Sequence, residues 1–389
     1  MDKKYDVIVV GAGFAGATIA NKLANANKKV LIIEKRNHIG GNAYDYYNEH
    51  GVLVHKYGPH IFHTSIKRVF DYLKSFVKFE KYEHRVLGNI DGTLVPIPFN
   101  FTSLERLFGS QAKDIENKLL AKFSNQARVS VLDLMNDSDN VIKDFGKYVY
   151  EKVFAFYTAK QWRIKIKDID KSVINRVPVV IGYEDLYFSD SYQFMPKNGF
   201  TDIFDKMLDS PNIDIIFGTS ANDVLTLKDN KILFKNQEFK GKVVYTGALD
   251  ELFNYQFGIL PYRSLRLKFE DHDITWYQPA SVVNYTTSEK YTRISEFKYL
   301  SNQDIPGHTT ILKEYPLSYT EKNYRRATPY YPIQNEVNIQ KYQRYKNLLS
   351  NYKNVYLCGR LAEYEYYNMD KVVDKALDVA QKIIDELDR

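Results

Sequence analysis

A glycine-rich turn near the start of the chain has the residue types and spacing that bind the pyrophosphate of a dinucleotide. Gly11, Gly13 and Gly16 follow the apolar run from Val7 to Val10. Gly11 permits a tight turn, Gly13 lets the backbone approach a pyrophosphate, and Gly16 lets the following helix pack against a sheet. The phosphates would lie at the N-terminus of that helix, where unpaired N–H groups favour negative charge. The motif therefore predicts a dinucleotide site.

An acidic residue follows the glycine motif at the distance where dinucleotide-binding folds hold the ribose. Glu34 ends a second apolar run, Leu31 to Ile33, about 20 residues after the glycines. A carboxylate there accepts hydrogen bonds from a ribose 2′-hydroxyl and repels a 2′-phosphate. We therefore expect a cofactor of the NAD or FAD kind. The alternative, a turn with only a structural role, leaves the register of strand, helix and acidic residue unexplained.

Two histidines invite a metal interpretation that the sequence does not favour. His60 and His63 follow Pro59, which breaks any helix there, and no third ligand is close in the sequence. We expect hydrogen-bonding groups at a cofactor and no metal. Motifs for a serine or cysteine nucleophile and for a P-loop are missing as well. Since a second glycine motif is also missing, a redox-active cofactor would need an external reductant such as NADPH.

Composition excludes further classes of protein. The chain has 389 residues, a net charge of +6 and a single cysteine, Cys358, so it can form no intramolecular disulfide and no cysteine-built metal site. Lys and Arg are scattered among Asp and Glu, whereas nucleic-acid binding requires a basic cluster. No apolar run approaches the roughly 18 residues of a membrane span, and none has the form of a signal peptide. We expect a cytoplasmic protein that binds neither nucleic acid nor membrane.

The elements that must position these residues lie at both ends of the chain. A helix is expected from Phe14 to about Ala26, between the two apolar strands. Near the other end, a strand from Tyr356 leads through Gly359 and Arg360 into a helix that begins at Asp370. Such a helix brings backbone N–H groups back to the cofactor. Both ends of the chain are therefore expected at one ligand.

The middle of the chain changes from helix to strand patterns. From Ser103 to Lys152 apolar residues recur at helical spacing, with breaks at Gly109, Ser124–Asn125 and 136–140. A hairpin turn is expected at Asp91-Gly92. Later segments alternate as strands do, and the strands expected there are Tyr262–Leu267, Tyr291–Phe297 and Thr309–Tyr315. Arg293 within one of them needs an anionic partner, either a ligand or a carboxylate such as Glu296.

A set of motifs along nearly the whole chain resembles the bacterial UDP-galactopyranose mutase family. In chain order the motifs are Gly11–Gly16, Gly40–Asn42, Tyr57–Thr64, Tyr157–Trp162, Arg176–Pro178, Pro329–Pro332 and Gly359–Leu361. The resemblance implies a flavoenzyme that interconverts the pyranose and furanose forms of a nucleotide sugar, with FAD active when reduced. In that family flavin N5 is taken to attack the anomeric carbon, which accounts for the missing protein nucleophile.

The resemblance also implies a fold and a division of the chain. We expect an α/β protein with a Rossmann-like FAD-binding domain, an inserted helical subdomain and a larger, mostly antiparallel β-sheet substrate domain. The first would comprise residues 1–78, 198–250 and 351–389. The helical subdomain would span 101–160, and the substrate domain 79–100, 161–197 and 251–350. A homodimer is expected from the family alone.

Residue roles carry over position by position. Arg176, in a segment that is a mobile loop in the family, and Arg293 match diphosphate-binding arginines, and His63 and Arg263 match positions close to the flavin. These make Arg176, Arg293 and His63 the expected catalytic residues. The residues expected at the cofactor are Gly11, Gly13, Phe14, Ala15, Gly16, Glu34, Lys35, Gly41, Asn42, His60, Arg360 and Met369. The residues expected at the substrate are Phe154, Tyr157, Thr158, Trp162, Arg176, Tyr187, Arg293, Tyr331, Tyr366 and Asn368.

Three positions depart from the family pattern around the expected substrate pocket. Arg163, Phe194 and Asn368 stand where the family commonly has Gly, a small residue and Asp. The substrate therefore stays open among UDP-galactopyranose, the most favoured, dTDP-fucopyranose and UDP-N-acetylgalactopyranose. A conventional FAD-dependent oxidoreductase and a flavin-binding protein without catalysis are the alternatives from other classes.

Overall fold

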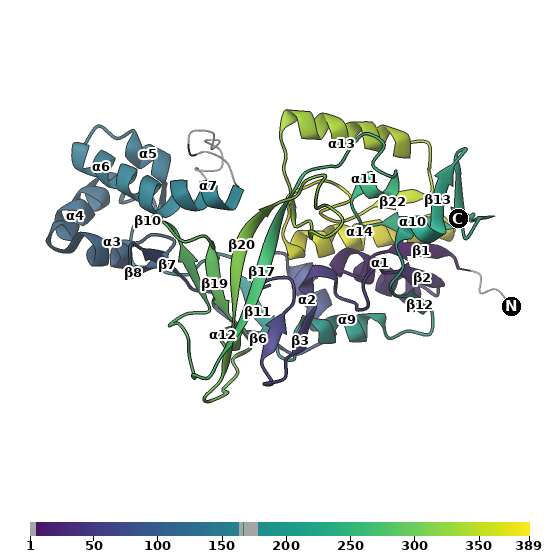
Figure 1. Ribbon diagram of the computed structural model, residues 1–389, viewed down its shortest axis with the longest axis horizontal. Helices are drawn as coiled ribbons and strands as arrows, with labels where there is room; N and C mark the ends of the chain where they lie inside the picture. The colour runs from purple at the N-terminus through teal and green to yellow at the C-terminus, as the bar shows by residue number, and fades with distance from the viewer. Residues whose placement is uncertain (1–4, 163–165, 167–177) are drawn as a thin grey trace.

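A five-stranded parallel sheet forms one end of the molecule in the computed structural model, which describes residues 5–162, 166 and 178–389 (Figure 1). The strand order is β12 (Ile213–Ile216), β2 (Val30–Ile33), β1 (Val7–Val10), β16 (Lys242–Tyr245) and β22 (Val355–Leu357). Every neighbouring pair is parallel. The first and last strands of the chain thus share one sheet, which confirms the predicted Rossmann-like fold.

Helices cover both faces of this sheet, because its strands are apolar on both sides. Val7 and Val9 point into a core shared with α1 (Phe14–Asn25), α9 (Phe200–Leu208) and α14 (Met369–Leu387). Ile8 and Val10 point the other way, toward α10 (Ala221–Val224), α11 (Leu249–Leu252) and α13 (Glu336–Leu349). Helices α1 and α14 pack side by side on the first face. Because α1 follows β1 and α14 follows the parallel strand β22, the N-terminal ends of both helices lie at the same edge of the sheet.

A seven-stranded sheet occupies the middle of the molecule (Figure 1). Its order is β21 (Tyr331–Pro332), β17 (Tyr262–His272), β20 (Thr309–Ser318), β19 (Arg293–Glu296), β18 (Val282–Tyr285), β7 (Val86–Ile90) and β8 (Thr93–Ile97). All pairs are antiparallel except β18 with β7. The turn between β7 and β8 has positive φ at Asp91 and Gly92, +48° and +93°, as the predicted hairpin requires. Strands β17 and β20 run farther than the sequence pattern indicated.

Helices at the far end of the molecule form a lobe with its own core (Figure 1). They are α3 (Phe101–Phe108), η2 (Gly109–Gln111), α4 (Ala112–Phe123), α5 (Val131–Met135), α6 (Asn140–Val149), the π-helix η3 (Tyr150–Ala155) and α7 (Phe156–Trp162). The breaks fall where the sequence predicted them. Val86 and Ile97 of the β7–β8 hairpin belong to the same core. The lobe is thus anchored to one edge of the seven-stranded sheet.

A small sheet joins segments that the sequence assigned to different domains. Strand β11 (Tyr192–Pro196) lies between β5 (Phe62–Thr64) and β6 (Phe79–Lys81). The predicted boundary after residue 78 is therefore crossed by hydrogen bonds, and the three-part division of the chain stays a prediction. The remaining elements are η1 (Gly41–Ala43), β3 (Asp45–Tyr47), β4 (Leu53–His55), α2 (Lys67–Lys74), β9 (Arg128–Ser130), β10 (Pro178–Val180), β13 (Leu225–Lys228), β14 (Lys231–Phe234), β15 (Gln237–Glu238) and α12 (Phe297–Ser301).

The described part of the chain contains no helix long and apolar enough to span a bilayer.

Candidate active site

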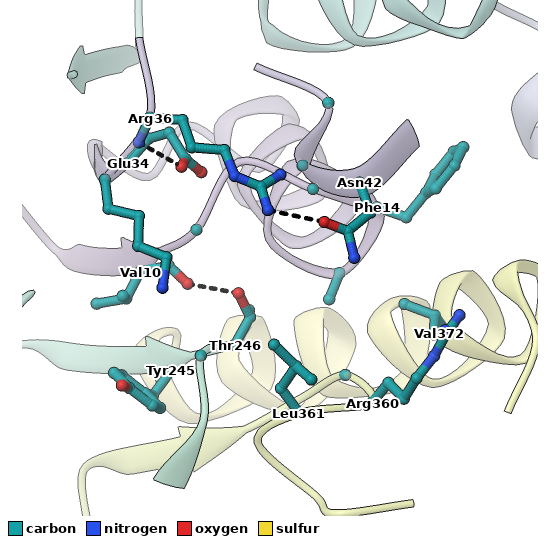
Figure 2. Close-up of a pocket in the computed structure, with 18 of the residues that line it drawn as sticks. Val10, Phe14, Glu34, Arg36, Asn42, Tyr245, Thr246, Arg360, Leu361 and Val372 are labelled. Carbon is teal, nitrogen blue, oxygen red and sulfur yellow. Dashed lines mark hydrogen bonds between the residues drawn. The ribbon is translucent and has the colours of Figure 1, made fainter. Parts of the chain in front are cut away.

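The glycine-rich turn after β1 forms a cradle with no room for side chains. Gly11 has φ +99°, and a Cβ on it would lie 2.2 Å from the Oγ1 of Thr246, whose hydroxyl donates to the Val10 carbonyl (Figure 2). A Cβ on Gly16 would lie 1.9 Å from the Gly11 carbonyl oxygen. Gly41, at φ +57°, would place a Cβ 2.9 Å from the Gly13 Cα. Two glycine segments thus meet backbone to backbone at the α1 N-terminus, as pyrophosphate binding needs.

A cavity opens over this cradle at the edge of the parallel sheet (Figure 2). Every residue predicted to bind the cofactor lines it except Gly16, whose place is between α1 and the sheet. The predicted residues in its wall are Gly11, Gly13, Phe14, Ala15, Glu34, Lys35, Gly41, Asn42, His60, Arg360 and Met369. The end of β16 and the segment after β22 complete the wall with residues 245–247 and 359–361.

Glu34 is held rigidly at the mouth of this cavity. Its side chain is buried, and its two oxygens accept hydrogen bonds from backbone N–H groups, from Ala12 at 2.8 Å and from Arg36 at 2.9 Å (Figure 2). Each carboxylate oxygen has a further lone pair. The carboxylate is therefore fixed in place and still able to accept from a ribose hydroxyl.

A second cavity adjoins the first, and the two share part of their wall. Asn42, His60, Tyr330, Arg360 and Met369 line both. The rest of the second wall comes from the seven-stranded sheet, α7, the segments around β5 and β11, and the segments before β7 and α14. Its predicted site residues are His63, Tyr157, Tyr187, Arg263, Arg293, Tyr331, Tyr366 and Asn368. A ligand in the first cavity can therefore face a ligand in the second.

Arg293 forms an ion pair inside the second cavity. Its Nε donates to Glu314 Oε1 at 2.6 Å, across the antiparallel pair β19–β20. Desolvation alone would lower the pKa of Arg293, but the Glu314 carboxylate raises the pKa above its usual value. The partner is not Glu296, which accepts instead from the backbone of Tyr277 and Gln278. Glu314 carries no motif, and the sequence analysis missed it.

Tyrosine rings and arginines are stacked together in the wall of the second cavity, and Arg360 among them also lines the first. Tyr331 lies on Tyr366, with ring centroids 4.5 Å apart and planes 23° apart. The Arg360 guanidinium carbon is 4.0 Å from the centroid of Tyr331, and that of Arg263 is 5.8 Å away. Such stacking orients the guanidinium groups and leaves their in-plane N–H donors available to a ligand. Desolvation lowers the pKa of Arg263, so an anion beside it would be strongly favoured.

Histidines in the cavity wall are uncharged or tied to a carboxylate. His60 Nδ1 lies 2.9 Å from the Gly58 carbonyl oxygen, so that nitrogen carries the proton and Nε2 is left as an acceptor. Desolvation lowers the pKa of His60 to about 3 and that of His84 to about 3. His63 Nδ1 lies 2.8 Å from Asp190 Oδ2, and its ring stacks on Phe188 with a centroid distance of 3.6 Å. Phe188, Asp190 and His84 had no signal in the sequence.

Several predicted residues do not reach the second cavity. Phe194 stacks on Phe70 in the hydrophobic core, with centroids 4.7 Å apart, and it lines neither cavity. The expectation that it borders the substrate pocket is therefore wrong, because its strand turns this ring toward α2. Thr158 lines neither cavity. Phe154 is buried in the helical core and lines a smaller neighbouring cavity together with Tyr157 and Tyr187. Trp162 ends α7, and Arg163 and Arg176 lie outside the described residues.

Lys160 fastens helix α7 to the sheet. Its Nζ donates to the backbone carbonyls of Tyr285 at 2.8 Å, Glu289 at 2.8 Å and Tyr291 at 3.1 Å. Desolvation lowers the pKa of this lysine. Because α7 also carries Tyr157 and Gln161 into the cavity, the ammonium group positions one wall of the site.

We expect Lys160→Met to destabilise the protein by about 2 kcal/mol, because carbonyl groups that are now bonded lose their donor. Turnover at low substrate concentration should also fall, since the helix that carries Tyr157 is no longer fastened to the sheet. Lys152→Met is the matched control: that lysine is in the preceding π-helix η3 and makes an exposed pair with Asp91, so its loss should cost less than about 1 kcal/mol. Urea unfolding measures both, and equal costs would contradict this role for Lys160.

Comparisons with known proteins agree with this geometry. A family profile described as UDP-galactopyranose mutase matches residues 152–366, and one for an NAD(P)-binding Rossmann-like domain matches residues 9–76. The chain is 37% identical to UDP-galactopyranose mutase of Mycoplasma genitalium over 98% of this chain and 95% of the relative. It is 34% identical to dTDP-fucopyranose mutase of Escherichia coli over 97% and 98% of the two chains. A crystal structure of reduced UDP-galactopyranose mutase has the same fold, with a TM-score of 0.73 at 17% identity, covering 98% of this chain and 95% of that chain.

Proposed function

This chain belongs to the UDP-galactopyranose mutase family, so it is an isomerase of that type, and we propose that it interconverts UDP-galactopyranose and UDP-galactofuranose. One observation carries the proposal: a cavity lined by Arg263, Arg293 and Arg360 opens directly onto the dinucleotide cavity. A nucleoside diphosphate in the second cavity would therefore meet the cofactor at the shared wall. Arginine is the side chain best suited to such a diphosphate.

We propose FAD as the cofactor, and the residues present fit it. The backbones of Gly13 and Gly41 approach so closely that a Cβ on Gly41 would lie 2.9 Å from the Gly13 Cα, as a pyrophosphate cradle requires. Glu34 is fixed by two backbone N–H groups where it would accept from a ribose hydroxyl. The pyrophosphate would be held by the α1 N-terminus and Arg360, and the flavin by His60 and Met369 at the shared wall. When bound and reduced, the flavin supplies the nucleophile for the anomeric carbon of the sugar.

The protein's own residues would bind and orient the leaving diphosphate. The negative charge on the diphosphate grows as the glycosidic bond breaks, and guanidinium groups held in place stabilise that charge without rearranging. Desolvation in the cavity raises the pKa of Tyr187 and that of Tyr366. Both phenols therefore stay protonated and can donate hydrogen bonds to phosphate oxygens. We propose the same diphosphate-binding role for Arg176 as for Arg293.

The choice of sugar is the finer part of the proposal. The relatives at comparable identity include a UDP-galactopyranose mutase and a dTDP-fucopyranose mutase, so dTDP-fucopyranose and UDP-N-acetylgalactopyranose are the alternatives. The test is to supply the reduced protein with the furanose form of each nucleotide sugar and to separate products by chromatography. We expect the highest kcat/KM with UDP-galactofuranose. A higher kcat/KM with either of the other two sugars would contradict the proposed substrate but leave the proposed type of reaction unchanged.

Asn368, which stands where the family commonly has Asp, lines the second cavity. It precedes α14 and makes no capping hydrogen bond there, so its amide is available to a substrate hydroxyl. We expect Asn368→Asp to change the ratio of kcat/KM for UDP-galactofuranose and dTDP-fucofuranose by about tenfold or more, since a carboxylate accepts but does not donate. Phe194→Leu is the control, because that ring lines neither cavity. An unchanged ratio for Asn368→Asp would exclude this residue from sugar selection.

Three further features are proposed on family grounds alone. The reductant would be external, of the NADPH kind. The chain would act as a homodimer, and the reaction would take place in the cytoplasm.

A further inference from the structure

Three potential metal ligands from distant parts of the chain meet away from both cavities. His50 lies in the turn between β3 and β4, Asp271 is near the end of β17, and His308 directly precedes β20. One nitrogen or carboxylate oxygen from each lies within 4.8 Å of the other two. The two imidazole rings lie face to face, with centroids 3.5 Å apart and planes 25° apart. None of the three residues lines the first or the second cavity of the active site.

Neighbouring residues contact two of these groups. Asp271 Oδ1 accepts a hydrogen bond from the Thr310 hydroxyl at 2.6 Å. His308 Nδ1 lies 3.4 Å from Asp273 Oδ1, so a proton on Nδ1 would face that carboxylate and Nε2 would be left as the ligand atom. Such outer carboxylates are common at metal-binding histidines.

The nitrogen left over is the most informative atom of the cluster. His308 Nε2 is buried and has no hydrogen-bond partner among the described residues, and it lies 3.7 Å from Asp271 Oδ1. A buried polar atom without a partner is costly. The His308 side chain is only 13% exposed, while those of Asp271 and His50 are 44% and 38% exposed. An ion could therefore enter from solvent and reach a buried ligand.

We propose that His50, Asp271 and His308 bind a zinc ion, with water completing the coordination. Two imidazoles and one carboxylate favour Zn²⁺ over Mg²⁺ or Ca²⁺, which prefer oxygen ligands. The ligand atoms now lie within 4.8 Å of one another and would have to move closer, which the position of His50 on an exposed turn permits. The ion would link the β3–β4 turn to the β17–β20 pair, where Asn48 already donates to Thr310 at 2.8 Å. This site does not depend on the proposed reaction.

Its test is zinc titration of the full chain, without an affinity tag and after treatment with EDTA. Isothermal titration calorimetry should show saturable binding of one Zn²⁺ per chain, with thermal unfolding shifted upward by zinc and unaffected by equal Mg²⁺. His50→Gln and His308→Gln should each weaken zinc binding at least tenfold. His272→Gln is the matched control, since the side chain of His272 points to the opposite face of β17 from that of Asp271. The affinity of this variant for zinc should equal that of the unsubstituted protein.

Cobalt provides a readout that does not depend on the variants. The unsubstituted chain should give the visible absorption of Co²⁺ in a low-coordinate nitrogen and oxygen site, and Zn²⁺ should displace it. Absence of saturable zinc binding would overturn the proposal and leave the histidines as a stacked pair without a metal. Zinc binding of equal strength in the His50 and His308 variants would also overturn it, by placing the ion elsewhere.

Discussion

Arg293→Ala is expected to lower kcat by about a thousandfold, because in the proposed site it removes a preformed positive charge from the place where the leaving diphosphate would gain negative charge. Substrate affinity should fall as well, since the proposed role also has the guanidinium contact the ground-state diphosphate. Arg293→Lys should recover only part of the rate, because an ammonium group cannot present two parallel donors. The measurement is turnover of the reduced protein with UDP-galactofuranose at saturating and limiting concentrations.

The control must separate lost catalysis from lost stability. Arg293→Ala leaves the Glu314 carboxylate, which is 2% exposed, without its partner. We expect a cost on the order of 2 kcal/mol, less than for a fully buried pair because a third of the arginine faces the cavity. The double variant Arg293→Met with Glu314→Gln removes both charges and should recover most of that stability. If this double variant turned over at the rate of the unsubstituted protein, Arg293 would have no role in catalysis.

Gly41→Ala is expected to reduce the flavin content of the purified protein about tenfold. The added Cβ would lie 2.9 Å from the Cα of Gly13, so the two backbone segments of the cradle would have to separate. Gly41 also has φ +57°, which costs about 1 kcal/mol for a residue with a side chain. The absorbance of bound flavin, measured per chain, gives the occupancy.

Gly51→Ala is the matched control for the strain. Gly51 also has a positive φ, +75°, but a Cβ on it would meet nothing within 4 Å. The two variants therefore share the backbone penalty and differ in the contact with Gly13. Gly51→Ala should keep its flavin. Equal flavin content in the two variants would show that the Gly13–Gly41 contact does not shape the cofactor site.

Local patterns in the sequence were sufficient to predict much of the fold. The glycine motif, the apolar strand before it and the acidic residue after the next strand can each be recognised from neighbouring residues alone. The structure places all three as predicted. The breaks between the helices at Gly109 and after Phe123 were equally readable, because glycine and polar residues end helices by their own conformational preferences.

Contacts between segments that are distant in the sequence could not be predicted in this way. The sequence indicated that Arg293 needs an anionic partner, but only the register of β19 with β20 selects Glu314. The parallel pairing of β18 with β7 and the contact of His63 with Asp190 likewise depend on tertiary packing. Phe194 was misplaced for this reason, since a ring on a strand can face either the cavity or the core. The cluster of His50, Asp271 and His308 has no motif at all.

The most direct test of the mutase function compares the reduced and the oxidised protein with the same substrate. UDP-galactofuranose is incubated with the flavin-loaded protein before and after reduction by dithionite, and the products are separated by chromatography. We predict UDP-galactopyranose from the reduced protein only, with no net consumption of reductant. A protein that is active when oxidised and whose flavin is reduced in equal amount by its substrate would be a conventional oxidoreductase, and that result would contradict the mutase function.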